Sequence, residues 1–221
     1  MSSASILKNP SAPQARPEII AKLKTIAVAL LSDNLHRNRG SVGLSPYHAP
    51  APLAGTAVTV RTRGGDNLAV LRAYDFCRPG DVLVIDAGGD LTNAVFGGIM
   101  AFGGETMGLG GMIVDGAIRD VAEIGARSFP VYARGVSHRG PYKDGPGEIN
   151  VPVCVGGMVV RPGDIIVGDR DGLCSFPQEG AEEVIQKALA QHAKEEATIQ
   201  SIREGRWDRS FVDALEARCM N

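Results

Sequence analysis

The middle of the chain alternates apolar runs with segments whose apolar residues recur at helical spacing. The run Asp81–Asp86 (DVLVID) is apolar between its two acids, which is typical of a strand covered on both faces. Met112–Val114 and Val131–Ala133 predict further strands, and alternating Val and Thr predict another over Ala54–Arg63. Helices are expected between these strands, over 66–74, 92–107 and 119–126. This alternation predicts an α/β layer with some parallel pairing.

The two ends of the chain have different patterns. Residues 1–16 are rich in Ser and Pro and predict a flexible arm, after which Pro17 opens a helix of about 18 residues. Short apolar runs between 151 and 176, separated by Gly-Gly, Pro-Gly and Asp-Gly turns, predict an antiparallel section. Two helices are expected after them, Gln178–Glu204 and Trp207–Met220. The expected divisions are an arm over 1–16, a single domain over 17–205 and a C-terminal extension over 206–221.

Composition narrows the function classes. The chain has 221 residues, 44% hydrophobic and 22% charged, which suits one globular domain. The formal net charge of -2 provides no broad basic field, so we expect neither nucleic acid nor a membrane as a partner. The N-terminus lacks the apolar segment of a signal peptide, and no apolar run reaches the ~18 residues of a membrane span. Four cysteines without a CxxC pair are expected as reduced thiols, which favours a cytoplasmic location.

Glycine is concentrated just before the first candidate site. Of the 28 glycines, 11 fall between Gly80 and Gly116. In the segment VDGAIRD the chain is expected to turn at Gly116, so that Arg119 and Asp120 stand where a helix begins. Strand ends before helix starts are where α/β proteins place ligands. Arg binds carboxylates through two hydrogen bonds, and Asp suits Mg²⁺ or Mn²⁺. Two interpretations stay open: a ligand site, or an ion pair that only caps the helix.

The segment Gly97-Gly98-Ile99-Met100 lies near the start of an expected helix. Glycine inside a helix costs ~1 kcal/mol, so its presence needs a reason. One reason is that the exposed amides of Gly98, Ile99 and Met100 bind a carboxylate. The other is close helix packing.

An acid also lies on an apolar stripe of the long C-terminal helix. The stripe consists of Ile185, Leu189, His192, Glu196 and Ile199, at steps of four, three, four and three. An acid in that place must be paired, in contact with water, or at a subunit interface. Glu195 points about 100° away from it.

The loop that contains His138, Arg139 and Lys143 is rich in Gly and Pro and could serve as a lid. Lys143 is the only lysine between Lys24 and Lys187, and a loop position disfavours a Schiff-base mechanism. The sequence contains no P-loop and no HExxH motif, and GGETMGLGG is not the dinucleotide-binding GxGxxG.

At these residues the chain resembles a known family. It is similar to the superfamily of the regulator of ribonuclease activity A (RraA-like), and within it to the branch of 4-hydroxy-4-methyl-2-oxoglutarate / 4-carboxy-4-hydroxy-2-oxoadipate aldolases. The resemblance covers residues 20–205. The matching stretches are AGTAVTV, RPGDVLVIDAGG, GLGGMIVDGAIRD, FPVYARG and INVPVCVGGMVVRPGDIIVGDRDG.

The resemblance implies a compact α/β mixed-sheet sandwich with a swivelling β/β/α core, phosphohistidine-domain-like, and a long C-terminal helix. It also implies a homotrimer or hexamer with sites between subunits. The aldolase branch uses Mg²⁺ or Mn²⁺ to cleave 4-hydroxy-2-oxo acids to pyruvate, and it decarboxylates oxaloacetate. By the matching motifs, Arg119 would bind substrate, Asp120 would hold the metal, the amides of Gly97–Met100 would bind the pyruvyl carboxylate, and Glu196 would be an acid lent by the neighbouring subunit.

One departure from the family pattern concerns Gly98. Aldolases of this branch have an acid at the position that is followed by twenty residues and then Arg-Asp, whereas counting back from Arg119 reaches Gly98. Asp90 or Glu105 could substitute for that acid. The departure keeps two alternatives open beside the aldolase: a non-catalytic regulatory protein of the RraA type, and another metal-dependent lyase or hydratase that acts on oxo acids.

Overall fold

A ten-stranded mixed sheet forms the centre of the protein in the computed structural model, which describes residues 5–37 and 40–219. Its middle strands are mutually parallel in the order β3-β4-β6-β7. They are β3 (Leu53–Thr62), β4 (Asp81–Asp86), β6 (Gly111–Ile118) and β7 (Val131–Val136). The first five residues of β4 are buried, as its continuous apolar run predicted. The predicted α/β class with a long C-terminal helix is confirmed.

Shorter strands extend this sheet at its edges. They are β1 (Ile6–Lys8), β2 (Ser45–Pro46), β5 (Ala94–Phe96), β8 (Gly147–Ile149), β11 (Ile165–Gly168) and β12 (Leu173–Phe176). A separate hairpin joins β9 (Val153–Val155) to β10 (Met158–Val160). Because β9 pairs with β10 and β11 with β12 in antiparallel register, the predicted antiparallel section is confirmed.

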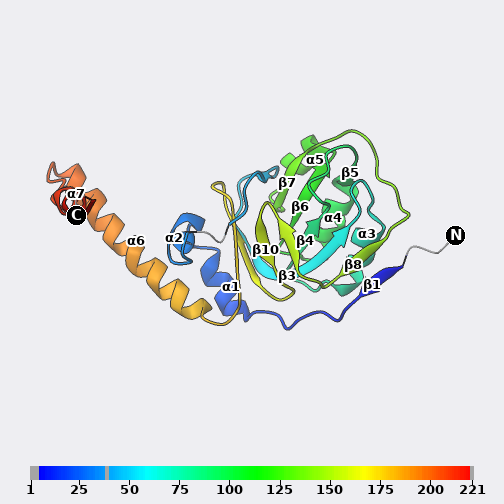
Figure 1. Ribbon diagram of the computed structural model, residues 1–221, viewed down its shortest axis with the longest axis horizontal. Coiled ribbons are helices and arrows are strands. Elements are labelled where there is room, and N and C mark those ends of the chain that lie inside the picture. Colours follow the sequence, from blue (N-terminus) through cyan, green and yellow to red (C-terminus); the bar gives the residue numbers. More distant parts are fainter. Residues whose placement is uncertain (1–4, 38–39, 220–221) are drawn as a thin grey trace.

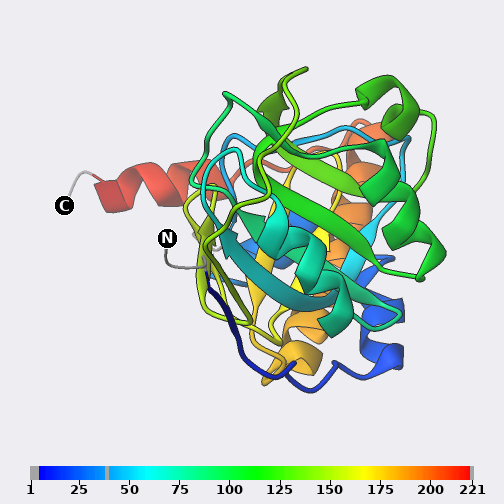
Figure 2. The ribbon, with the colours of Figure 1, turned by 90° about the vertical axis from the view of Figure 1, so that its right-hand side faces the viewer.

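Short helices connect the parallel strands. They are α3 (Leu68–Ala73) with a 3₁₀ turn at Tyr74–Phe76, α4 (Gly98–Thr106) and α5 (Val121–Gly125). Helix α3 lies over the sheet beside β3 and β8 (Figure 2). The apolar sides of these elements meet in a core that includes Leu83, Ile85, Val114 and Ile118, all fully buried. This core fixes the end of β6, where the candidate site begins.

The long helix predicted from Pro17 is two helices, α1 (Pro17–Leu23) and α2 (Val28–Asp33). The amide of Val28 donates to the Asp169 carboxylate at 2.8 Å. That hydrogen bond satisfies an amide at the start of α2, as a capping residue would, and sequence periodicity carries no information about it. Both helices pack with the first half of α6 (Ala181–Arg203) in a second core.

The helix predicted from Thr92 to Met107 is also wrong in its first part. Ala94–Phe96 forms β5, which pairs with the far end of β6, and α4 begins only at Gly98. Strand β6 is correspondingly longer than predicted, so Gly116 lies inside a strand and not in a turn. The pairing with β5 decides both differences, because it gives the backbone of 94–96 partners that a helix could not reach.

The N-terminal arm is bound to the domain over its described part. Ile6–Lys8 pairs in parallel with β8, and Ser11 Oγ donates to the carbonyl of Phe76 at 2.7 Å. The prediction of a flexible arm is therefore wrong from residue 6 onward. Residues 1–4 lie outside the described part.

Helix α6 leaves the body of the protein and α7 (Phe211–Cys219) lies at its far end (Figure 1). From His192 to Glu204 every residue but Ser201 is exposed. Both predicted C-terminal helices are present, although Met220 lies outside the described part. No helix in the described ranges has both the length and the apolar character needed to cross a membrane.

Candidate functional site

The candidate site is a corner where β6 ends and α5 begins. The Arg119 amide donates to the carbonyl of Phe96 at 3.0 Å, which ties the end of β6 to β5. Asp120 then adopts the left-handed conformation with φ 60° and stands at the N-cap of α5. Aspartate tolerates this conformation better than most residues. Its side chain reaches the start of α4.

Asp120 joins this corner to α4. Its Oδ2 accepts a hydrogen bond from the Gly98 amide at 3.0 Å and lies 3.7 Å from the Nε of Arg119. Both side chains of the Arg-Asp pair are 43% exposed. The pair is thus open to solvent and is not an ion pair sealed inside the fold.

The two glycines at the start of α4 make room for these side chains. A Cβ atom at Gly97 would lie 2.7 Å from Asp120 Oδ2 and 3.0 Å from Arg119 Cγ. A Cβ atom at Gly98 would lie 2.5 Å from Glu123 Oε2 and 3.3 Å from the Cβ of Asp120. Gly97 and Gly98 are therefore explained by contact with charged side chains.

Glu123 is a functional candidate that the sequence interpretation missed. Its carboxylate occupies the space into which an acid at position 98 would project. Two residues that are three apart at the start of a helix lie on one side of it, so the spacing of Asp120 and Glu123 was an available signal. Arg127 lies 3.7 Å from Glu123 and completes the group of charges.

The acids proposed earlier as substitutes have other partners. Asp90 accepts hydrogen bonds from the amide and hydroxyl of Thr92, which outweigh its burial and lower its pKa. Glu105 forms an ion pair with Arg127 at 2.7 Å. Glu123 is thus the acid that the structure brings to Gly98.

The predicted carboxylate-binding amides are partly occupied by the chain itself. The Gly98 amide donates to Asp120, and the Met100 amide donates to the Gly97 carbonyl at 3.0 Å. The Ile99 side chain is 87% exposed beside them. Carboxylate binding by this turn stays a prediction, and it would draw chiefly on the Ile99 amide and the positive end of α4.

Glu196 lies elsewhere in the same chain. It is on the exposed part of α6, where it lines a groove of about 360 Å³ together with His192 and Glu195 of that helix and residues of α2 and of the segment 25–27 before it. The structure does not bring Glu196 to Arg119 and Asp120 within one chain. Its predicted role therefore depends on a second copy.

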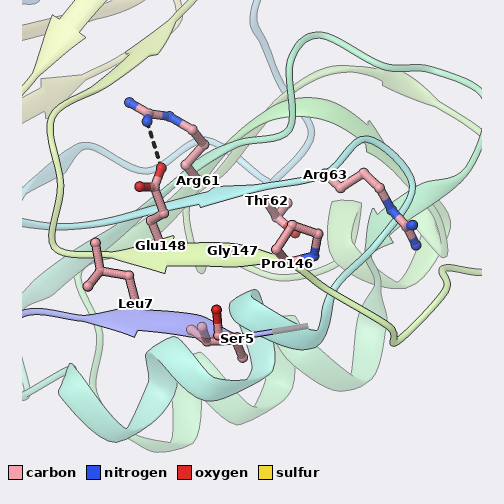
Figure 3. A pocket seen from close by; sticks show the side chains of 9 residues that line it. Ser5, Leu7, Arg61, Thr62, Arg63, Pro146, Gly147 and Glu148 are labelled. Carbon is pink, nitrogen blue, oxygen red and sulfur yellow. Dashed lines mark hydrogen bonds and ion pairs between the residues drawn. The ribbon is translucent and has the colours of Figure 1, made fainter. Parts of the chain in front are cut away.

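A larger hollow of about 720 Å³ lies beside β1, β3 and β8 (Figure 3). Arg61 points toward Glu148 there and pairs with it at 2.7 Å, and Arg63 pairs with Asp66 at 3.0 Å. Both arginines thus hold carboxylate partners at 3.0 Å or less, whereas Arg119 lies 3.7 Å from Asp120.

A metal ion would find two carboxylates at the corner. Among the described residues, no group of three or more His, Cys, Asp and Glu side chains is arranged to hold a metal. Mg²⁺ is commonly bound by one or two carboxylates with substrate and water oxygens. The convergence of Asp120 and Glu123 on Gly98 fits that donor set.

The protein is an α/β protein with an Arg-Asp corner at the end of a buried strand, the place where such folds commonly hold ligands. The family model described as "RraA-like: Aldolase/RraA" matches residues 28–174. The chain belongs to this Aldolase/RraA family.

Individual relatives agree with this assignment. A protein of Halalkalibacterium halodurans named "Putative 4-hydroxy-4-methyl-2-oxoglutarate aldolase" is 42% identical over 193 residues, 86% of this chain and 91% of the relative. The "4-hydroxy-4-methyl-2-oxoglutarate aldolase" of Thermus thermophilus is 34% identical over 58% of this chain and 77% of its own length. The structure of Streptomyces coelicolor RraAS2, titled an unusual member of the RNase ES inhibitor RraA family, is similar with a TM-score of 0.77 and 26% identity, covering 84% of this chain and 97% of that one.

Proposed function

We propose that the protein is a divalent-metal-dependent carbon–carbon lyase that cleaves 4-hydroxy-2-oxo acids and releases pyruvate, with decarboxylation of oxaloacetate as a second activity. The observation that carries this proposal is the convergence of Arg119, Asp120 and Glu123 on two glycines at the start of α4. The aldolase names of relatives that share up to 42% identity support the reaction class.

Asp120 and Glu123 are the proposed ligands for Mg²⁺ or Mn²⁺, with substrate and water oxygens completing the coordination. A bound divalent ion supplies Lewis-acid stabilisation of negative charge on the 2-oxo oxygen. Glu123 thereby takes the place of the acid that Gly98 lacks.

Arg119 is the proposed contact for the carboxylate and 2-oxo oxygens of the substrate. In the aldol cleavage the C3–C4 bond breaks, the 4-hydroxyl loses its proton and becomes a carbonyl, and the bond's electron pair enters the pyruvate enolate. Arg119 stabilises that enolate charge, which rises only as the bond breaks. Carbon 3 then takes a proton to give pyruvate. With oxaloacetate the same bond breaks and carbon dioxide leaves.

A lysine mechanism has no support from the fold. Lys143 lies on an exposed loop, and no other lysine occurs between Lys24 and Lys187. A Schiff-base lysine is usually desolvated so that its amine is neutral.

The proposed active form is a homo-oligomer, a trimer or a hexamer, in which Glu196 of one copy reaches the corner of the next. Glu196 stands on the part of α6 that leaves the body, so a neighbouring copy is the partner within its reach (Figure 1). Ile99 and Phe102 beside the corner are exposed apolar residues that a neighbour would cover. Glu196 is the proposed acceptor for the proton of the 4-hydroxyl group.

Pyruvate release from 4-hydroxy-4-methyl-2-oxoglutarate and from oxaloacetate tests the reaction. We expect activity with added Mg²⁺ or Mn²⁺ that a chelator abolishes and that excess metal restores. Activity that is unaffected by the chelator would contradict the metal-dependent mechanism.

A second candidate function is that of a non-catalytic regulator of a partner enzyme. It is favoured by the similarity to RraAS2, which is described as a ribonuclease-inhibitor family member. A folded, metal-supplied chain that releases no pyruvate from either substrate would favour this candidate over the lyase.

A further inference from the structure

Arg127 connects α4 and α5 beside the Arg119 corner. Its Nη1 lies 2.7 Å from Oε2 of Glu105 on α4, and its Nη2 lies 3.7 Å from Oε1 of Glu123 on α5. Its guanidinium carbon also lies 5.0 Å from the centroid of the Phe102 ring, which is a cation–π contact. One arginine side chain thus contacts both of the helices whose first turns form the corner.

Arg127 is itself held in place by its own contacts. Its amide donates to the carbonyl of Ile124 at 3.0 Å, and its carbonyl accepts a hydrogen bond from the Ala49 amide at 2.8 Å. Its side chain is 32% exposed and donates to Glu105 at hydrogen-bonding distance. A guanidinium group that is fixed in this way can orient a second carboxylate through its other donors.

The two carboxylate oxygens of Glu123 face different groups. Oε1 faces Arg127, whereas Oε2 is the atom that a Cβ atom at Gly98 would meet at 2.5 Å. Asp120 is on that same side, because its Oδ2 accepts a hydrogen bond from the Gly98 amide. Oε2 is therefore the Glu123 oxygen that a cation bound to Asp120 would find.

Glu123 needs a restraint to keep this orientation. Its side chain is 55% exposed, and fixing a glutamate side chain costs rotamer entropy. Among the ion pairs of the described residues, Glu123 takes part in one, and its partner is Arg127. Arg127 is therefore the source of the restraint.

The opposite side of the corner is a fixed wall. The loop over residues 137–144 joins β7 to β8, and a Cβ atom at Gly140 would lie 3.1 Å from Nη1 of Arg119. Asn93 Nδ2 donates to the carbonyl of Gly140 at 2.6 Å, which holds the loop there and disfavours the lid that its composition suggested. The exposed side chain of Glu123 is thus the part of the corner that a positioning contact would affect most.

We infer that Arg127 is a positioning residue, which holds the Glu123 carboxylate with Oε2 toward the corner and thereby strengthens the binding of a divalent cation there. This inference rests on the proposed function, in which Asp120 and Glu123 bind that cation. Arg127 contacts neither the cation nor the substrate and acts only through Glu123.

The charge of Arg127 makes the inference testable, because charge and position predict opposite results. A guanidinium group near a bound divalent cation repels it, so removal of the charge alone would tighten cation binding. Loss of the restraint would weaken binding, because the cation would then have to order the Glu123 side chain itself. Both side chains are partly exposed, so salt and water screen the repulsion and the loss of positioning should dominate.

Binding of Mn²⁺ alone to the full-length protein, without substrate, tests the inference. Calorimetry, or the electron paramagnetic resonance signal of free Mn²⁺, gives the Kd. Arg127→Gln should raise the Kd by about fivefold. Arg127→Lys keeps the charge but lacks the fork of the guanidinium group, and it should raise the Kd by about twofold. In a Glu123→Ala background, Arg127→Gln should not raise the Kd further, because no carboxylate is left to position.

Arg16→Gln is the matched control. Arg16 also pairs with two acids, Glu18 on α1 and Glu182 on α6, and we expect its loss to leave the Kd at the wild-type value. Melting temperatures of the metal-free variants should stay within about 5 °C of wild type, because partly exposed ion pairs contribute little to stability. If Arg127→Gln does not fold, the Kd of Arg127→Lys decides the test.

The outcomes separate the inference from the proposed function. A wild-type protein that binds no Mn²⁺ would overturn the metal-dependent function and the inference with it. A wild-type protein that binds Mn²⁺, with Arg127→Gln binding it as tightly or more tightly, would overturn the inference alone. The same holds if Arg127→Gln weakens binding equally with and without Glu123.

Discussion

Asp66 and Asp120 are two carboxylates that each accept a hydrogen bond from the backbone of another segment, yet their surroundings differ. Asp66 is fully buried and accepts bonds from the amides of Leu68, Asp144 and Gly145, at 3.0, 2.7 and 3.0 Å. Asp120 accepts one amide bond, from Gly98, and is 43% exposed. Asp66 has its hydrogen-bonding capacity filled by the chain, whereas Asp120 keeps an open side.

The difference teaches how to separate a structural acid from a candidate ligand. Burial by itself raises the pKa of Asp66, but the three amides and Arg63 favour the charged form and bring its pKa below the ordinary value. Asp66 thereby anchors the distal half of the loop that borders the site. Asp120 is held by one amide only, so its remaining acceptor positions face the solvent where a ligand would come.

The largest expected effect comes from Asp120→Asn. Asparagine tolerates the left-handed conformation and can still accept the Gly98 amide, but it lacks the charge that binds a cation. Pyruvate release should fall by about a thousandfold, while the free energy of unfolding changes by less than ~1 kcal/mol. An active Asp120→Asn variant would contradict the distinction between Asp66 as a structural acid and Asp120 as a candidate ligand.

Asp66→Asn should have the opposite effect, with its main change in stability and not in pyruvate release. Its new amide group would face either the N–H of Leu68 or those of Asp144 and Gly145 with Arg63, so the free energy of unfolding should fall by about 2–4 kcal/mol. Chemical denaturation at neutral pH measures this change. A variant as stable as wild type would show that the buried bonds of Asp66 contribute little.

The lowered pKa of Asp66 also predicts that the effect of Asp66→Asn on stability depends on pH. Because the folded-state pKa of Asp66 is lowered, its contribution to stability is present above the unfolded value of about 3.9 and is lost as the pH falls through the folded value. The stability difference between wild type and Asp66→Asn should therefore shrink below about pH 4. Denaturation at several pH values checks this, and a difference that grows on acidification would contradict it.

Gly98→Asp sharpens the assignment of Glu123. A Cβ atom at position 98 would lie 2.5 Å from the Glu123 carboxylate, so the two acids cannot keep these positions together. Glu123→Ala alone should raise the metal concentration needed for half-maximal activity by about tenfold or more. Gly98→Asp combined with Glu123→Ala should recover part of that loss, and Gly98→Ala with Glu123→Ala is the uncharged control. A Glu123→Ala variant with the metal requirement of wild type would remove Glu123 from the site.

Glu196 is a third acid to compare with Asp66 and Asp120, and it does not reach the Arg119 corner of its own chain. Asp120→Ala and Glu196→Ala should each lose activity as separate proteins. Subunits mixed after unfolding and refolding together should regain about a quarter of wild-type sites, because each corner then draws its two acids from different copies at random. No recovery in mixed oligomers would place the complete site within one chain.

Much of the fold was predictable because its strands are locally encoded. DVLVID gave β4 over 81–86 without error, since a run buried on both faces needs no tertiary information to be recognised. β5 was not predictable in this way. Its residues 94–96 occur next to a helical pattern, and only pairing with the far end of β6 decides their conformation.

The site was predictable in part for the same reason. The pair Arg119-Asp120 and the turn from Gly97 to Met100 follow each other in the sequence pattern, and the structure brings them together through the bond between Asp120 and the Gly98 amide. Glu123 lies one helical turn beyond Asp120, but its contact with Gly98 is a tertiary contact that this spacing alone does not reveal. The contact of Gly140 with Arg119 depends on a loop fold that no local pattern records.

The left-handed backbone at Asp120 has a consequence for how this sequence can change. Glycine adopts that conformation without the steric penalty of a Cβ atom, so Asp120→Gly relieves a local cost of about 1 kcal/mol. A library screened for survival of heating would accumulate glycine at position 120, whereas one screened for growth on the reaction product would purge it. The two selections would pull the same codon in opposite directions.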